Sequence, residues 1–256
     1  MSDQKTDFSP RSSSAEKSNR EKFVDLFNNS PVSDSDLVYS QLSLYLSRQE
    51  FSRMIFLSDL YRSAIIPTNG TMFEFGTCYG RTAAILTNLR AIFEPYNFTR
   101  KLVIFDTFGG LLGTSEKDGH DPLAVDGLYS SGTGYEHHLE QVLSYHESEA
   151  PISHLQKFEI IKGDASLKLE EYLKRQPETI VSLAYFDFDI YKPTKDCLRL
   201  LRPHLTRNSV LVFDQLNCPG YPGETIAVAE EIGLDKVEIK RSPLTPWISY
   251  MTCDFR

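Results

Sequence analysis

The sequence predicts an α/β fold in which helices cover both faces of a mostly parallel β-sheet. The run MFEFGTCYGRT at positions 72–82 joins a short apolar strand, a glycine-containing turn and the start of a helix. Strand-like and helix-like segments then alternate through the rest of the chain, which favours crossover connections between parallel strands. The strands are apolar almost throughout, as expected where helices cover both faces of a sheet.

The alternation predicts each element in turn. We expect five strands and a closing hairpin, at residues 71–75, 101–105, 158–162, 180–186, 209–213, 237–240 and 247–252. The intervening helices are expected at residues 81–93, 135–145, 167–174, 194–201 and 223–232. A segment rich in Gly and Ser follows the second strand, and residues 109–150 are predicted to form a lid inserted there.

The N-terminal quarter of the chain differs from the rest. Residues 1–20 are polar and poor in aliphatic side chains, so we expect a disordered tail. Residues 21–66 have helical periodicity and are expected to form a helical cap, whose second helix would follow the possible N-caps Ser33 and Asp34. Residues 67–256 would then form the main domain.

Composition narrows the function classes. The chain has 256 residues, a net charge of −8 and no long Lys/Arg block, which argues against nucleic acid as a partner. No run of eighteen apolar residues and no signal peptide are visible, so we expect no membrane association. The four cysteines are scattered without a C-x-x-C pair, and a cytoplasmic protein is therefore expected.

Acidic residues recur where the predicted strands end. Glu74, Asp106, Asp187 and Asp214 end or follow four strands, and Asp164 follows the third strand by one residue. In an open α/β sheet, ligands bind beyond the carboxyl ends of the strands. The acids therefore indicate a binding site at that edge.

Four motifs carry a family resemblance: EFGTCYG at 74–80, DTFGGL at 106–111, DFDIY at 187–191 and FDQ at 213–215. With them the chain resembles a class I S-adenosylmethionine-dependent methyltransferase, which has a Rossmann-like, seven-stranded sheet. Within that class it is similar to the macrocin O-methyltransferase family, which methylates sugar hydroxyls in antibiotics such as macrolides and novobiocin. The resemblance extends from about residue 51 to the end of the chain.

The resemblance implies S-adenosylmethionine as cofactor. Glu74, Gly76 and Gly80 would line its methionine end, and Asp106 would accept hydrogen bonds from the ribose hydroxyls, a role that suits an acceptor-only carboxylate. Asp164 and Ala165 would contact adenine. The remaining residues of the predicted cofactor site are Thr77, Tyr79, Thr107, Phe108 and Asp187.

Relatives also hold a divalent metal, usually magnesium, with the first Asp of the Asp-x-Asp pair and two consecutive acids after the fifth strand. Asp187 and Asp214 match this pattern, whereas Gln215 stands at the second acidic position. An amide oxygen can bind magnesium, but the loss of one negative charge should weaken the site. The predicted ligands are therefore Asp187, Asp214 and Gln215, with metal dependence left open.

Methyl transfer to an alcohol needs an in-line approach and loss of the hydroxyl proton. Asp187, Asp189 and His120 are the candidate catalytic residues. Asp189 would be the base if the strand continues, since residues two apart project to the same side; alternatively it caps the turn before Tyr191. His120, in the lid beside Asp118, could contact the acceptor or remove its proton.

The sequence thus predicts an O-methyltransferase acting on a hydroxylated small molecule, such as a sugar or a glycosylated natural product. The resemblance also implies a homo-oligomer, since relatives often pair through their N-terminal helices. A non-catalytic S-adenosylmethionine-binding protein is an alternative that Gln215 keeps open. A nicotinamide-dependent oxidoreductase is a further alternative. Against it, Cys78 and Tyr79 stand where a G-x-G-x-x-G loop would need glycines.

Overall fold

The computed structural model describes residues 12–32 and 35–254. The chain divides into two compact units, residues 1–51 and 52–256, and the second contains the sheet. The strands are β1 (Thr71–Phe75), β2 (Leu102–Asp106), β3 (Phe158–Lys162), β4 (Val181–Phe186), β5 (Leu205–Phe213), β6 (Lys240–Arg241) and β7 (Ser249–Thr252).

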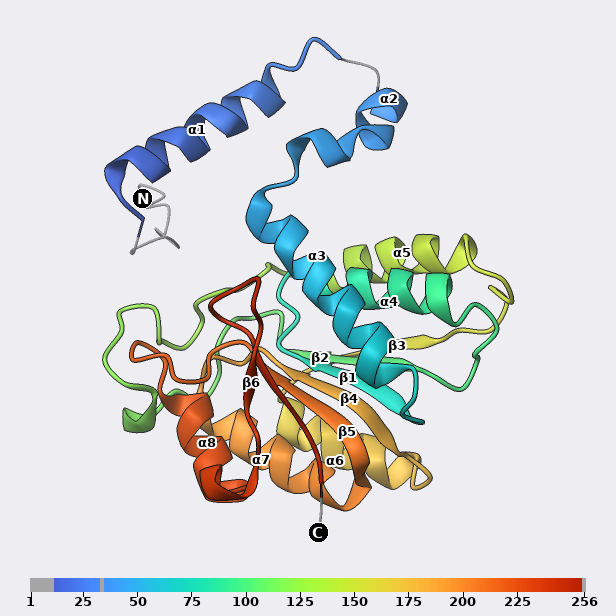
Figure 1. The fold of residues 1–256 in the computed structure, drawn as a ribbon, viewed down its shortest axis with the longest axis vertical. Coiled ribbons are helices and arrows are strands. Elements are labelled where there is room, and N and C mark those ends of the chain that lie inside the picture. The colour runs from blue at the N-terminus through green and yellow to red at the C-terminus, as the bar shows by residue number, and fades with distance from the viewer. Residues whose placement is uncertain (1–11, 33–34, 255–256) are drawn as a thin grey trace. The chain divides into compact units, whose positions relative to one another are not determined.

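These strands form one seven-stranded sheet in the order β3-β2-β1-β4-β5-β7-β6 (Figure 1). The first five are parallel, and β7 is antiparallel to both β5 and β6. The predicted Rossmann-like sheet with a closing hairpin is confirmed. Strand order reverses between β1 and β4, which is where ligands bind in folds of this kind.

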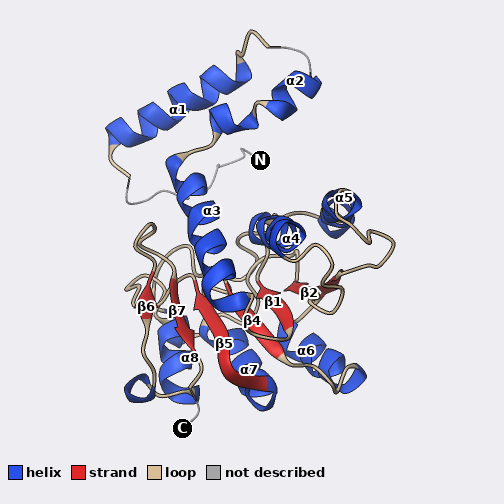
Figure 2. Ribbon diagram, turned by 45° about the vertical axis from the view of Figure 1, so that its right-hand side comes forward, coloured by secondary structure: helices blue, strands red, loops and turns tan. Residues whose placement is uncertain are grey.

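Helices cover both faces of this sheet (Figures 1 and 2). One face carries α4 (Arg81–Phe93), α5 (Tyr135–Ser148) and the part of α3 (Arg48–Leu60) from Ser52 onward. The other carries α6 (Ala165–Arg175), α7 (Tyr191–Leu201) and α8 (Gly223–Glu231). Short helical turns complete the unit: η2 (Tyr61–Ile65, a π-helical turn), η3 (Glu116–Asp118), η4 (Arg202–His204) and η5 (Leu234–Lys236).

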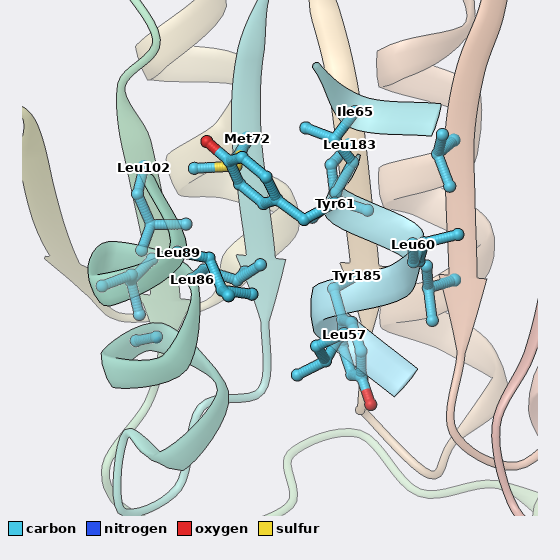
Figure 3. Close-up of a cluster of buried hydrophobic side chains, with 14 of the residues drawn as sticks. Leu57, Leu60, Tyr61, Ile65, Met72, Leu86, Leu89, Leu102, Leu183 and Tyr185 are labelled. Atoms are coloured by element: carbon cyan, nitrogen blue, oxygen red, sulfur yellow. The ribbon is translucent and has the colours of Figure 1, made fainter. Parts of the chain in front are cut away.

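Each face of the sheet has its own apolar core, because side chains alternate along a strand. On β1, Met72 packs into the core beneath α3, α4 and α5, while Phe73 and Phe75 pack toward α6 and α7. Figure 3 shows the first core, where Met72 and Tyr185 lie among leucines from α3 and α4.

The N-terminal unit begins its first helix earlier than predicted. Helix α1 (Ser14–Asn28) starts at a capping box in which Ser13 and Glu16 cap each other's backbone N–H, so residues 14–20 are helical rather than part of a tail. Helix α2 (Ser35–Ser40) and the turn η1 (Leu42–Tyr45) follow, and no residue of these three elements is buried. Residues 1–11 and the proposed caps Ser33 and Asp34 lie outside the described residues.

The predicted lid is shorter than its proposed range of 109–150. Helix α5 belongs to the main body, because its Leu139 and Leu143, one turn apart, are buried in the core. Residues 109–134 remain as a long loop. Backbone hydrogen bonds fasten this loop to itself, among them Leu111 N–H to the Leu128 carbonyl at 2.8 Å.

Candidate active site

A cavity of about 280 Å³ lies at the carboxyl ends of the parallel strands. Of the predicted cofactor residues, six line it: Gly76, Asp106, Thr107, Asp164, Ala165 and Asp187. The other residues of the predicted catalytic and metal sites that line it are Asp189, Asp214 and Gln215. The structure therefore gathers most of the predicted residues around one cavity.

The turn after β1 depends on its two glycines. Gly76 has φ 81°, and a Cβ there would lie 2.1 Å from the carbonyl oxygen of Asp187, so only glycine lets β1 and the end of β4 approach this closely. Gly80 begins α4 with φ 82°, and a Cβ there would lie 2.1 Å from Leu139 of α5. The close contact at Gly80 is thus between α4 and α5.

Asp106 is held as a fixed acceptor at the end of β2. Its Oδ2 accepts the backbone N–H of Cys78 at 2.8 Å, and its Oδ1 accepts that of Phe108 at 2.6 Å. Burial raises the pKa of Asp106, and these backbone hydrogen bonds oppose the rise. Each carboxylate oxygen has a second lone pair, so the group can still accept hydroxyl protons from a ligand in the cavity.

Asp164 has a structural task besides its place on the cavity wall. Its carboxylate caps α6, accepting the backbone N–H groups of Ser166 at 2.9 Å and Leu167 at 3.3 Å. The structure therefore accounts for this side chain without a ligand.

Five predicted cofactor residues do not line the cavity. Glu74 is 1% exposed and accepts a hydrogen bond from the Thr77 hydroxyl at 2.7 Å, and burial raises the pKa of Glu74 to about 8. Tyr79 is 61% exposed and packs edge-on against Tyr135. Gly80 begins α4, and Phe108 is buried in the core; neither residue lines the cavity.

Three carboxylates and one amide form the acidic end of the cavity: Asp187, Asp189, Asp214 and Gln215. Burial and the neighbouring carboxylates of Asp214 and Asp189 raise the pKa of Asp187 well above its ordinary value. Burial also raises the pKa of Asp189 to about 7, as does the charge of Asp214, while a hydrogen bond from the Gln215 side chain lowers it. Asp187 and Asp189 therefore keep their protons to a higher pH than exposed carboxyl groups do, because charging several carboxylates side by side in a buried site is unfavourable.

Asp189 reaches the cavity by a route that the sequence did not predict. Strand β4 ends at Phe186, as predicted, so the condition under which Asp189 would project beside Asp187 from a continuing strand is not met, and Asp189 lies in a left-handed turn with φ 63°. It does not cap α7 either. Asp118, from the lid, accepts the Tyr191 N–H at 2.5 Å.

His120 does not join the site. It is exposed in the lid and does not line the cavity, although the neighbouring Asp118 is buried. A catalytic role for His120 thus has no support in this arrangement.

Two buried side chains that the sequence analysis missed hold the acidic end. Glu224, at the start of α8, is 0% exposed and accepts the backbone N–H of Gln215 at 3.0 Å and that of Asp189 at 3.3 Å. Arg53, on α3, donates to Asp214 and to the hydroxyl of Tyr185. The loops after β4 and β5 are thereby fixed to α8 and α3.

The lid closes another side of the cavity. Tyr129 lines the cavity, its hydroxyl lies 3.1 Å from that of Tyr221, and its carbonyl accepts a contact from the Cys78 thiol at 3.6 Å. Cys78 follows Gly76, so these contacts join the lid to the glycine turn as well as to the loop after β5. Cys78, Cys197, Cys218 and Cys253 are free thiols.

The donor set at the acidic end consists of hard oxygen ligands, which suit magnesium. Asp189 Oδ1 and Gln215 Oε1 are buried without a hydrogen-bond partner, so both oxygens have lone pairs that a cation could use. Within residues 12–32 and 35–254, no three Asp, Glu, His or Cys side chains are grouped so as to hold an ion.

Comparisons with known proteins agree with this geometry. No family model matches the sequence, and no curated protein matches it in a sequence search. Among solved structures, the calicheamicin methyltransferase CalS11 superposes with a TM-score of 0.90 and 34% identity, over 94% of this chain and 93% of that one. An apo structure of CalS11, described as a TDP-rhamnose 3'-O-methyltransferase of calicheamicin biosynthesis, superposes with a TM-score of 0.82 and 32% identity. That match covers 94% of this chain and 95% of the other.

The O-methyltransferase NovP shares the fold at 15% identity, with a TM-score of 0.51 over 78% of this chain and 79% of that one. No helix in the described part of the chain has the length and apolar character to cross a membrane. The sheet order, the glycine turn and the strand-end acids match the predicted architecture, and the identity to CalS11 extends over nearly the whole chain. The chain belongs to the family of class I S-adenosylmethionine-dependent O-methyltransferases that includes CalS11.

Proposed function

We propose that this methyltransferase acts on a hydroxyl of a sugar, with a nucleotide-linked deoxysugar as the acceptor class. The observation that carries the proposal is the 32% identity, over 94% of the chain, to a protein described as a TDP-rhamnose 3'-O-methyltransferase. The wider class, a glycosylated natural product, is the second acceptor to test.

The cofactor would lie along the wall formed by β1 and β2. S-adenosylmethionine supplies a methyl group on a positively charged sulfur, which makes that methyl electrophilic. Asp106, fixed by the backbone of Cys78 and Phe108, would accept the ribose hydroxyl protons. Ala165, at the start of α6, would border the adenine.

The acidic end would receive the acceptor hydroxyl. Asp189 is the candidate base, because its Oδ1 is buried without a partner on the cavity wall and its pKa of about 7 suits a group that takes up a proton near neutral pH. Asp187, Asp214 and Gln215 would hold magnesium, with Asp189 near it. A bound divalent cation lowers the pKa of a coordinated hydroxyl.

The test is methyl transfer followed by mass spectrometry, with TDP-rhamnose, free rhamnose and a glycosylated natural product offered separately. We expect TDP-rhamnose to gain one methyl group, and Asp189→Asn to abolish the gain while leaving S-adenosylhomocysteine binding intact. Parallel reactions with a chelator and with added Mg²⁺ test the metal. Cofactor binding without transfer to any hydroxylated acceptor would instead support the non-catalytic alternative.

Calorimetric titration separates the remaining alternative. We expect S-adenosylmethionine to bind and NAD to give no heat of binding. The cytoplasmic location, the helical cap role of residues 21–66 and pairing with a second copy of the chain stay predictions.

A further inference from the structure

A buried arginine stands behind the acidic end of the cavity. Arg53 is 8% exposed and lies on the face of α3 that also buries Phe56, Leu57 and Leu60. Spacings of three, four and seven residues place all four on one helix face. Position 53 therefore lies in the buried apolar face of α3, where an aliphatic side chain is expected. A charged guanidinium buried there needs an anionic or hydrogen-bonding partner to offset the cost of removing it from water.

Two of the groups that Arg53 contacts meet at one oxygen of Asp214, while the hydroxyl of Thr82 accepts a longer hydrogen bond from Arg53 Nη1, at 3.4 Å. Arg53 Nη2 donates to Asp214 Oδ1 at 3.1 Å, and the Tyr185 hydroxyl donates to the same Oδ1 at 2.9 Å. Arg53 Nη1 in turn donates to the Tyr185 hydroxyl at 2.8 Å. The three groups form a closed triangle beneath the cavity, within the core where Figure 3 shows Tyr185 beside Leu57.

This triangle determines what Asp214 presents to the cavity. Its Oδ1 is taken by two donors, whereas no donor among residues 12–32 and 35–254 contacts its Oδ2. Asp214 lines the cavity, and Arg53 and Tyr185 do not. The oxygen that Asp214 can offer to a ligand is therefore Oδ2. The hydrogen bonds that Arg53 and Tyr185 donate to Oδ1 fix the direction in which Oδ2 points.

We propose that Arg53 is a positioning residue, which acts with Tyr185 to orient Asp214 toward the acceptor end of the methyltransferase site. A guanidinium is planar and donates to two acceptors at once, so it can hold Asp214 and Tyr185 together. A lysine ammonium at the end of a flexible chain keeps the charge but lacks that fixed fork. The positioning role of Arg53 depends on the proposed function in one respect only, namely that the acidic end of the cavity receives the acceptor.

Crystal structures of the full chain with S-adenosylhomocysteine give the first test. We compare wild type, Arg53→Met, Arg53→Lys and Tyr185→Phe. In Arg53→Met we expect the Asp214 carboxylate to rotate away from its wild-type orientation. In Tyr185→Phe we expect the carboxylate to keep that orientation, because Arg53 still donates to it. An unchanged Asp214 in a folded Arg53→Met protein overturns the proposal. Should that variant fail to fold, the Arg53→Lys structure decides in the same way.

Kinetics give the second test, with TDP-rhamnose as acceptor. A misplaced group of this kind costs on the order of 10- to 100-fold in rate, so we expect Arg53→Lys to lower kcat by about that factor. The Kd for S-adenosylhomocysteine should change less than about threefold, since Asp106 and the glycine turn lie on another wall. Wild-type kcat in Arg53→Lys overturns the proposal.

Arg100→Lys is the matched control, because Arg100 is also buried and ion-paired, with Glu94, but does not line or support the cavity. It should lose thermal stability and keep kcat; an equal loss of kcat in both variants would reduce Arg53 to a structural role. If wild type does not methylate TDP-rhamnose, the sugar proposal fails, and the orientation of Asp214 in the crystals still decides the role of Arg53.

Discussion

Replacing Glu74 by glutamine should stabilise the cofactor-free protein at high pH. Burial raises the pKa of Glu74 to about 8, against an ordinary value of 4.5, and the Thr77 hydroxyl only partly offsets this. One carboxylate oxygen, Oε2, is buried without a partner. Ionising the side chain in the folded protein is therefore costly, whereas the unfolded chain ionises it freely.

The sign follows from proton linkage. Between about pH 4.5 and pH 8 the folded protein holds a proton on Glu74 that the unfolded chain has released. The free energy of unfolding therefore falls as the pH rises through this window and is lowest above it. From about pH 6 to about pH 9 the loss due to Glu74 is on the order of 3 kcal/mol, or roughly 5–10 °C in Tm for a unit of this size.

Thermal unfolding measured by circular dichroism at several pH values checks this prediction. Glutamine keeps the shape of the side chain and an acceptor for the Thr77 hydroxyl but does not titrate. As the pH rises from about 6 to about 9, the Tm of wild type should therefore fall more steeply than that of Glu74→Gln. Glu140→Gln removes the same charge from an exposed site on α5 and should follow wild type. Parallel curves for wild type and Glu74→Gln across this range would refute the reasoning.

Three further substitutions test the site and its frame. Asp106→Asn places an NH₂ group against a backbone N–H and should weaken S-adenosylhomocysteine binding about 10- to 100-fold by calorimetry, with unchanged affinity as the contradicting result. Glu224→Gln breaks one of two backbone contacts between α8 and the cavity loops and should lower kcat about tenfold with little change in cofactor Kd; a matching loss of cofactor affinity would contradict it. Gly80→Ala combines an unfavourable φ with a clash against Leu139 and should lower the free energy of unfolding by about 2 kcal/mol or more, measured by urea denaturation; an unchanged midpoint would show that α5 yields easily.

The sheet was predictable because its strands are short apolar runs that alternate regularly with helical segments along the chain. Strand β1 and strand β3 have the predicted bounds. Strand β5 begins at Leu205, four residues before the prediction, because the exposed polar residues Arg207 and Asn208 interrupt the apolar pattern of a buried strand. The helix α5 was assigned to the lid for the opposite reason: the buried pair Leu139 and Leu143 is visible in the sequence, but its packing partner on α4 is not.

The candidate site was predictable where it depends on chain topology. Strand-end acids such as Asp106 and Asp214 must meet at one edge of a parallel sheet, and they do. Arg53 was missed, although an arginine within the stripe of Phe56 and Leu57 was a usable signal. Tyr129 had none, since its place on the cavity wall depends on how a loop without periodicity folds back over the glycine turn.

The amide at Gln215 fits the charges around it better than a second carboxylate would. Its backbone N–H donates to the buried Glu224. A carboxylate at this position would add a like charge next to Asp187, whose pKa is already raised by its neighbours. Arg53 is ion-paired with Asp214, and the Oε1 atom of Gln215, a residue of the cavity wall, is buried without a hydrogen-bond partner. The departure from the acidic pattern is therefore compatible with methyl transfer.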